Sequence, residues 1–304
     1  LRRSRGLGDV YKRQELGLSS YDSTQCNWYS QSGTSFSPNN VLAIYVNDAQ
    51  EISSNTIYQN MYYYGSVIRS YQSDNYNVDL IIENNHIELF TKYDWETYST
   101  AINTQNSSNY SGTTLIKGNT IEIYNGTNAA IIAGNHNDII DNTISFGSMY
   151  TQNCGLSQYG SYLRAIDVDD SDHHIIRGNT ITNFAKGIEM SNSTDNVVDS
   201  NSIYTISSYT TYSGSNYDWS NGNYGIYAVN SDSLFITNNT ITTGTGTLIY
   251  QTNGASTIKY NLLETFSGRG IWCENQAGVE FSNNTIVSTY GSGDYGIYLS
   301  LIHI

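Results

Sequence analysis

The feature that most constrains this chain is a short motif, Asn-x-Ile or its variant Asn-x-Leu, that returns along most of its length. Successive occurrences are separated by 30, 34, 23, 37, 22, 38, 22 and 23 residues, so a unit of 22–23 residues recurs and the longer intervals contain insertions. The motif begins at nine positions: Asn55, Asn85, Asn119, Asn142, Asn179, Asn201, Asn239, Asn261 and Asn284.

A second marker, a small or aliphatic residue followed by Ile, keeps a fixed phase with the first. It occurs ten times, at Ala43-Ile44, Val67-Ile68, Ala101-Ile102, Ala130-Ile131, Ala165-Ile166, Gly187-Ile188, Gly225-Ile226, Leu248-Ile249, Gly270-Ile271 and Gly296-Ile297. Two markers in phase over ten units indicate a tandem repeat, which restricts the chain to an architecture of stacked units.

Each unit reads as short alternating apolar and polar runs separated by Asn, Ser, Asp and Gly, as in residues 187–203. Such runs have the period of a β-strand and are too short for a helix. One strand cannot bury its apolar side alone, but coils stacked at a spacing of ~4.8 Å bury a continuous Ile/Val/Leu column. The sequence therefore predicts an all-β fold, a parallel β-helix of about ten coils. Asn at the turns tolerates the left-handed conformation and can form hydrogen-bonded ladders between coils.

Composition excludes several classes of protein. The chain of 304 residues has 13 Lys and Arg against 27 Asp and Glu, a net charge of −14, so it lacks the basic stripe that nucleic-acid binding needs. No apolar run approaches the ~18 residues of a membrane-spanning helix. The three cysteines are odd in number and far apart, which indicates neither a disulfide framework nor a metal knuckle: Cys26, Cys154 and Cys273.

The two ends of the chain carry related hexapeptides. Asp9–Gln14 can be encoded by GAT GTG TAT AAG AGA CAG, whose reverse complement encodes Leu-Ser-Leu-Ile-His-Ile, the sequence of Leu299–Ile304. This string resembles the mosaic end of transposase-based sequencing libraries. We therefore expect residues 1–14 and 299–304 to be translated adaptor, residues 15–40 to be a partial coil or lateral loop, and residues 41–298 to be the β-helix. A targeting signal or anchor would then be lost by truncation.

The coils resemble the pectate-lyase-like superfamily of right-handed parallel β-helices over about residues 41–298. Coils rich in Tyr, Asn and Thr, such as residues 224–241, look most like the adhesin-like surface proteins of anaerobic archaea and bacteria. This resemblance implies a right-handed β-helix at the cell surface or outside the cell, a polysaccharide or glycan partner, and further domains of the same chain. The insertions, which solenoids place as loops on one face, are Ser70–Asn77, Thr91–Ala101, Ser145–Leu163 and Ser207–Tyr224.

Equivalent positions of successive coils form columns, and the residue after each marker Ile should point outward. The C-terminal members of this outward column are the aromatic residues Tyr227, Tyr250, Trp272 and Tyr298. Trp219 and Tyr224 from the neighbouring insertion could extend the column. Exposed rings along a groove are typical of glycan binding, since sugar rings stack on them. Alternatively, the rings stabilise the sheet by stacking on one another.

Charged residues occupy the same column further toward the N-terminus. Arg164 and Asp167 align with Lys186 and Glu189 one coil later. Three interpretations stay open. The carboxylates could bind Ca²⁺, with Asp167, Asp169, Asp170 and Glu189 as ligands. The same region could catalyse polysaccharide lysis or glycoside hydrolysis through Asp167, Asp169, Glu189, Arg164 and Lys186. The charges could also neutralise one another as surface pairs. The neighbouring His173 and His174 are expected to be turn residues.

The catalytic motifs of the superfamily are absent from this sequence. Neither the Asn-Thr-Asp or Gly-His-Gly motifs of the hydrolases nor the Arg-x-x-Pro-x-x-Arg stretch of pectate lyases occurs. The sequence thus favours a fragment of an extracellular adhesin-like β-helix that binds polysaccharide or glycan without catalysis and without an obligatory cofactor. A lyase or hydrolase, and a structural surface spacer, are the alternatives.

Overall fold

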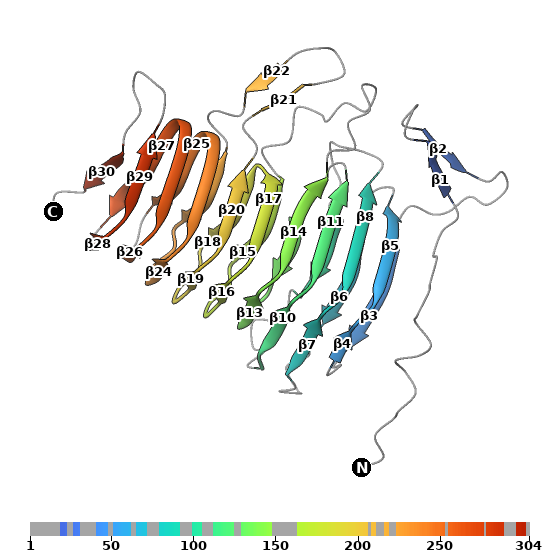
Figure 1. Cartoon of the computed structure of the whole chain (residues 1–304). Helices are drawn as coiled ribbons and strands as arrows, with labels where there is room; N and C mark the ends of the chain where they lie inside the picture. The colour runs from blue at the N-terminus through green and yellow to red at the C-terminus, as the bar shows by residue number, and fades with distance from the viewer. Residues whose placement is uncertain are drawn as a thin grey trace.

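The computed structural model describes sixteen stretches of the chain, and every regular element in them is a β-strand. The coils stack along one axis from the N-terminal to the C-terminal end (Figure 1). The described residues are 19–22, 27–30, 41–47, 51–61, 65–71, 79–91, 99–104, 112–124, 129–147, 163–205, 208–210, 216–218, 223–252, 255–276, 278–288 and 296–301.

The first face is a sheet of nine parallel strands of three or four residues each, in which every strand pairs in register with the strand of the next coil. Its strands are β4 (Glu51–Ser53), β7 (Leu80–Glu83), β10 (Thr114–Lys117), β13 (Asn137–Ile140), β16 (Ile175–Arg177), β19 (Val197–Asp199), β24 (Leu234–Thr237), β26 (Ser256–Lys259) and β28 (Val279–Ser282).

The second and third faces are joined into a 17-stranded sheet, because the long strands β25 (Thr240–Thr252) and β27 (Leu262–Gln276) run through both. The second face also contains β5 (Thr56–Met61), β8 (His86–Thr91), β11 (Thr120–Tyr124), β14 (Thr143–Gly147), β17 (Thr180–Phe184), β20 (Ser202–Thr205) and β29 (Thr285–Ser288). The third face also contains β3 (Val41–Asn47), β6 (Gly65–Tyr71), β9 (Ser99–Asn103), β12 (Ala129–Ala133), β15 (Arg164–Asp169), β18 (Lys186–Ser191), β23 (Tyr224–Val229) and β30 (Ile297–Leu301).

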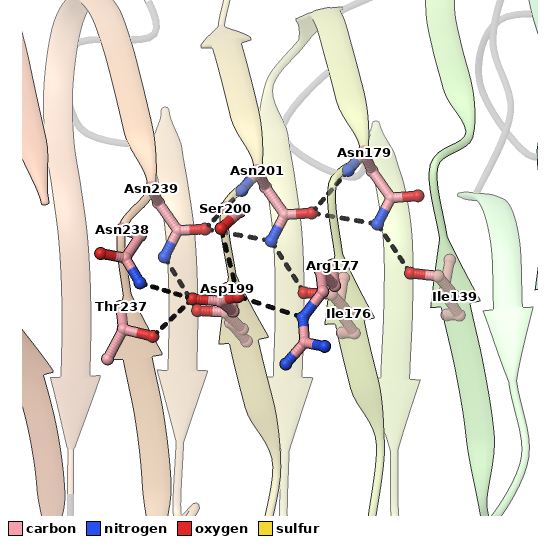
Figure 2. A network of polar contacts seen from close by, with 11 residues as sticks. Ile139, Ile176, Arg177, Asn179, Asp199, Ser200, Asn201, Thr237, Asn238 and Asn239 are labelled. Atoms are coloured by element: carbon pink, nitrogen blue, oxygen red, sulfur yellow. Dashed lines mark hydrogen bonds and ion pairs between the residues drawn. The ribbon is translucent and has the colours of Figure 1, made fainter.

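The predicted asparagine ladder is confirmed at the corner between the first and second faces. The side-chain Nδ2 of each motif Asn donates to the Oδ1 of the motif Asn one coil later, at 2.9–3.0 Å, from Asn55 to Asn284. The same oxygen also accepts the backbone N–H of the preceding Asn, as Asn201 does from Asn179 at 3.0 Å. Figure 2 shows the rungs formed by Asn179, Asn201 and Asn239.

The left-handed conformation falls on a different residue from the one that the sequence suggested. The ladder asparagines are not among the residues with positive φ, and the residue immediately before each of them is. These residues are Ser54, Asn84, Gly118, Asp141, Gly178, Ser200, Asn238, Tyr260 and Asn283, with φ between 54° and 67°. The ladder position is therefore selected for its amide, and the turn position before it carries the left-handed backbone.

The core is a set of Ile-rich columns between the three faces. The marker isoleucines from Ile68 to Ile271 are fully buried on the third face, and Ile121, Ile144, Ile181 and Ile241 are fully buried on the second. Each such side chain contributes on the order of 2 kcal/mol by leaving water. The small residue before the marker Ile has a packing cause: a Cβ placed on Gly187 would lie 2.5 Å from Ile203 Cγ2 and 2.6 Å from the carbonyl oxygen of Gly225.

Other described strands pair outside the three faces. β1 (Ser19–Asp22) pairs antiparallel with β2 (Asn27–Ser30), and β21 (Ser208–Thr210) pairs antiparallel with β22 (Asn216–Asp218). Most residues of the long insertions, the adaptor-like residues 1–14, Trp219, Cys26 and Cys154 lie outside the described residues. Within the described part of the chain, no helix is long and apolar enough to cross a bilayer.

Candidate functional site

The third face carries the outward column that the sequence predicted, and the strand register confirms its order. Each residue that follows a marker Ile pairs with its equivalent one coil away, from β3 to β30. The column reads Tyr45, Arg69, Asn103, Ile132, Asp167, Glu189, Tyr227, Tyr250, Trp272 and Tyr298. Its charged and aromatic members therefore do lie on adjacent coils.

A second column lies three residues before the first. Its pairings place Arg164, Lys186, Tyr224, Thr247 and Arg269 at equivalent positions of β15, β18, β23, β25 and β27. The sequence reasoning missed Arg269, although Arg269-Gly270-Ile271-Trp272 repeats the pattern of Lys186-Gly187-Ile188-Glu189. Nine residues of the two columns on these strands form what we call the strip: Arg164, Asp167, Lys186, Glu189, Tyr224, Tyr227, Tyr250, Arg269 and Trp272.

The N-terminal half of the strip is a network of four charges. Arg164 Nη1 donates to Asp167 Oδ2 at 2.8 Å, and Arg164 Nε lies 2.5 Å from Glu189 Oε2 on the next coil. Lys186 Nζ donates to the same Glu189 oxygen at 2.9 Å. The guanidinium of Arg164 thus bridges both carboxylates, and Glu189 is held by two cations.

These charges are buried, which differs from the expected exposed surface pairs. Asp167 is 6% exposed and Glu189 is 7% exposed. Burial raises the pKa of Asp167 although Arg164 opposes the shift, and burial lowers the pKa of Lys186 although Glu189 opposes it. For Arg164, burial acts to lower the pKa, but Asp167 and Glu189 together raise it. The network is electrically balanced, since two cations face two carboxylates.

The C-terminal half of the strip is aromatic. The rings of Tyr227 and Tyr250 stack with centroids 5.0 Å apart and planes 10° from parallel, and Trp272 meets Tyr250 edge-on at 5.5 Å. Tyr224 lies against Tyr227 at 4.6 Å in a tilted arrangement. Lys186 Nζ lies 4.2 Å from the centroid of the Tyr227 ring, so it joins the charged half to the aromatic half.

The stacking decides which parts of the rings remain free. The Tyr227–Tyr250 separation equals the coil spacing, so the two rings stack along the axis of the solenoid and cover each other's faces. Lys186 covers a further ring surface of Tyr227. The ring faces that Tyr227 and Tyr250 turn toward each other are therefore covered by protein. The edges of the two rings are left for a ligand, the Tyr250 hydroxyl donates to Glu274 Oε2 at 3.4 Å, and all four rings of the strip are half-buried.

Each of the four carboxylates suggested as calcium ligands has a protein partner. Asp169 Oδ1 accepts from Ser191 Oγ at 2.6 Å and Asp170 Oδ1 accepts from Asn192 Nδ2 at 3.0 Å, while Asp167 and Glu189 face cations. Within the stretches that the structure describes, no three His, Cys, Asp or Glu side chains are grouped so that they could hold a metal ion. Tyr298 occupies its column position in β30, and Trp219 falls outside the described residues.

A buried histidine is a feature that sequence reasoning missed. His173 has the left-handed turn conformation that was expected, with φ of 61°, and it stacks on His136 of the previous coil at 5.1 Å. His174 is instead fully buried, where its Nδ1 accepts the backbone N–H of Asn137 at 3.3 Å. Burial lowers the pKa of His174 to about 4, so its ring is neutral at pH 7.

Coils of three parallel strands, an inter-coil asparagine ladder and a side-chain strip along one face define this protein as a parallel β-helix solenoid. Residues 95–301 match the family described as "Right handed beta helix region", and the chain belongs to this family.

A solved structure of a double mutant of the tailspike protein of E. coli bacteriophage HK620 is similar at 11% identity, with a TM-score of 0.36. The match covers 79% of this chain and 54% of the tailspike chain, so this chain spans about half the length of that protein. No curated protein sequence matches the chain.

Proposed function

We propose that this chain is part of an extracellular, adhesin-like surface protein that contacts polysaccharide or glycan through the strip, without catalysis. The observation that carries the proposal is the run of half-buried rings Tyr224, Tyr227, Tyr250 and Trp272 beside a balanced charge network. The strip crosses five adjacent coils, a length of about 19 Å at the spacing of parallel strands.

The geometry favours contacts with the edges of the rings. A Tyr ring edge is apolar along its sides and carries a hydroxyl group at its tip, which suits the mixed surface of a sugar. The pKa of the Tyr250 hydroxyl is raised to about 12 by burial and by Glu274, so it stays protonated. It donates this proton to Glu274 Oε2 at 3.4 Å, and its oxygen can accept a hydrogen bond from a sugar hydroxyl. A polymer lying along the strip would meet such edges on successive coils.

The charge network supports binding rather than catalysis. A general acid or base needs a carboxylate or amine that can exchange a proton with substrate. Arg164 bridges Asp167 and Glu189, and Lys186 holds Glu189 from its other side, so these groups are already engaged with one another.

One observation favours a lyase or hydrolase as the second candidate. Buried groups with shifted pKa values cluster at active sites, and Asp167 and Lys186 are such groups on adjacent coils. In this reading the acid–base roles would be shared by Asp167, Asp169, Glu189, Arg164 and Lys186.

Binding of the full chain to a panel of polysaccharides, measured by affinity electrophoresis, tests the proposal. We expect the double variant Tyr250→Ala/Trp272→Ala to lose at least tenfold in affinity, while Tyr204→Ala, which removes an exposed Tyr from the second face, changes nothing. Equal binding by all three proteins would contradict the strip as the binding surface, and binding by none would favour a surface spacer.

The enzymatic alternative is tested on the same panel. Incubation with each polysaccharide, with and without Ca²⁺, should release no reducing ends and no unsaturated products. Product release that disappears in Glu189→Gln would replace the binding proposal with the second candidate, whereas release that persists in this variant would indicate a contaminant.

A further inference from the structure

We infer that Arg269, stacked on Trp272, is an oxyanion-binding residue that makes the strip select glycans bearing carboxylate or sulfate groups. The inference rests on the proposed function and names a substrate class for the same surface. It starts from a difference between coils that share one residue pattern.

Three coils of the strip place a cation three residues before an outward side chain. Arg164 precedes Asp167 and Lys186 precedes Glu189, and both cations form ion pairs with the carboxylate of their own coil. Arg269 precedes Trp272, so on its coil an indole replaces the carboxylate. Among the residues that the structure describes, no carboxylate lies in ion-pair contact with Arg269.

Stacking prepares the guanidinium for a ligand. Arg269 Cζ lies 3.5 Å from the centroid of the Trp272 ring. This contact fixes the plane of the guanidinium and uses one of its faces, but the N–H donors lie in the plane and are not consumed by the ring. A planar fork of N–H groups binds carboxylate and sulfate oxygens in pairs. Arg269 and Trp272 are both partly exposed, so a ligand can reach them.

The surroundings set the expected strength of the contact. Glu274 follows Trp272 by two residues, and its Oε2 lies 3.4 Å from the Tyr250 hydroxyl. The whole chain carries a net charge of −14. Both would repel a polyanion at a distance, so a preference for oxyanions must come from close contact with Arg269. We therefore expect modest affinity that persists only where an acidic group reaches the guanidinium.

The test compares three polymers with one glucan backbone: dextran, carboxymethyl-dextran and dextran sulfate. The full chain should bind the two charged polymers at least tenfold more tightly than dextran at 0.15 M salt. Arg269→Gln should remove this preference, so that its affinities for the two charged polymers fall to its own affinity for dextran, and Arg269→Lys should keep part of it. The carboxymethyl and sulfate arms show which oxyanion is preferred.

Lys259→Gln is the matched control, because it removes one positive charge from the first face. It should leave the preference unchanged, and the melting temperatures of both Gln variants should confirm that they fold. If Arg269→Gln and Lys259→Gln lose the preference for charged polymers equally, the preference is a net-charge effect and the inference is wrong. The inference is also wrong if the unmodified chain shows no preference. Neither result affects the proposed function, which is judged by the Tyr250 and Trp272 variant.

Discussion

At each rung of the asparagine ladder, one buried amide oxygen accepts two hydrogen bonds from the preceding coil. Asn201 Oδ1 accepts the backbone N–H and the side-chain Nδ2 of Asn179, both at 3.0 Å, and Asn201 Nδ2 donates to the carbonyl of Ile176. Asn201→Ala would remove these three hydrogen bonds and leave the buried backbone N–H of Asn179 without its side-chain acceptor, while Asn179 Nδ2 would keep its bond to the carbonyl of Ile139. We expect a loss of about 3 kcal/mol in the free energy of unfolding, measured by urea denaturation.

Thr180→Ala on the preceding coil is the control, because Thr180 is exposed and should tolerate the change. A loss below 0.5 kcal/mol for Asn201→Ala, on the order of a neutral surface substitution, would contradict a structural role for the ladder. The ladder could be predicted because the same residue type recurs once per coil. The left-handed residue before it could not, since Ser, Asn, Gly, Asp and Tyr all occupy that position.

His174 makes stability depend on pH. Its pKa is lowered to about 4 in the folded chain, against about 6.5 in an unfolded one, because burial excludes the charged ring. Above pH 6.5 the two states bind the same number of protons at this site. Between pH 6.5 and 4 only the unfolded state takes up the proton, so the folded state should lose up to about 3 kcal/mol.

The variant His174→Asn isolates this effect, because Asn137 and Asn196 occupy the same position on the two neighbouring coils. Thermal unfolding from pH 7 to pH 4 should show a smaller loss of stability for His174→Asn than for the unmodified chain. Comparing the two proteins cancels the contributions of other titrating groups to the pH dependence of stability. One of these groups is Asp167, whose raised pKa makes the folded state more stable as the pH falls. Parallel pH profiles would rule out His174 as the cause.

On some coils, the packing between the second and third faces leaves room only for Gly before the marker Ile. A Cβ on Gly187 would meet Ile203 Cγ2 and the backbone oxygen of Gly225, and the backbone oxygen cannot move aside without disturbing β23. Gly187→Ala should therefore destabilise the chain by about 2 kcal/mol through overpacking. Gly296 occupies the same marker position but has nothing within 4 Å, so Gly296→Ala should be neutral in the same urea measurement.

Strands β15 and β18 are linked by the charge network. Lys186→Met would leave two buried carboxylates to share Arg164, and we expect a loss of about 3 kcal/mol. The double variant Lys186→Met/Glu189→Met restores one cation per carboxylate, because Arg164 still pairs with Asp167. It should recover most of that loss, and a double-mutant cycle in urea measures the coupling. Additive effects would contradict the network.

The sequence predicted the columns of the strip better than the state of its side chains. Column membership follows from the spacing of the marker Ile, which is why Asp167 and Glu189 were correctly placed beside each other. Burial of these carboxylates and the stacking of Tyr227 on Tyr250 depend on side-chain rotamers, which the repeat does not specify. Arg269 escaped notice because its coil partner is Trp272 rather than an acid.

At the scale of the molecule, each coil of the described strands pairs only with its neighbours, so stability should be a sum of coil terms and interface terms. The strand pairings described above join only neighbouring coils, and the interval from Asn179 to Asn201 is one complete coil of 22 residues without an insertion. We expect the fold to survive deletion of a whole coil when the residues at the two cut points have the same turn conformation. Deletion of part of a coil should destroy the fold.

Deletion of residues 179–200 tests this property. It joins Gly178 to Asn201, and both Gly178 and the deleted Ser200 have positive φ, so the turn before the ladder Asn is preserved. Strand β16 would then face β24, and Ile176 would take the place of Val198 against Ile236. We expect a folded, cooperative β protein by circular dichroism, with an m-value in urea lower by about a tenth because less surface is exposed on unfolding. Deletion of residues 190–200 alone moves every later strand to the wrong face and should abolish the cooperative transition. If both deletion variants are unfolded, contacts between coils that are not nearest neighbours hold the solenoid together.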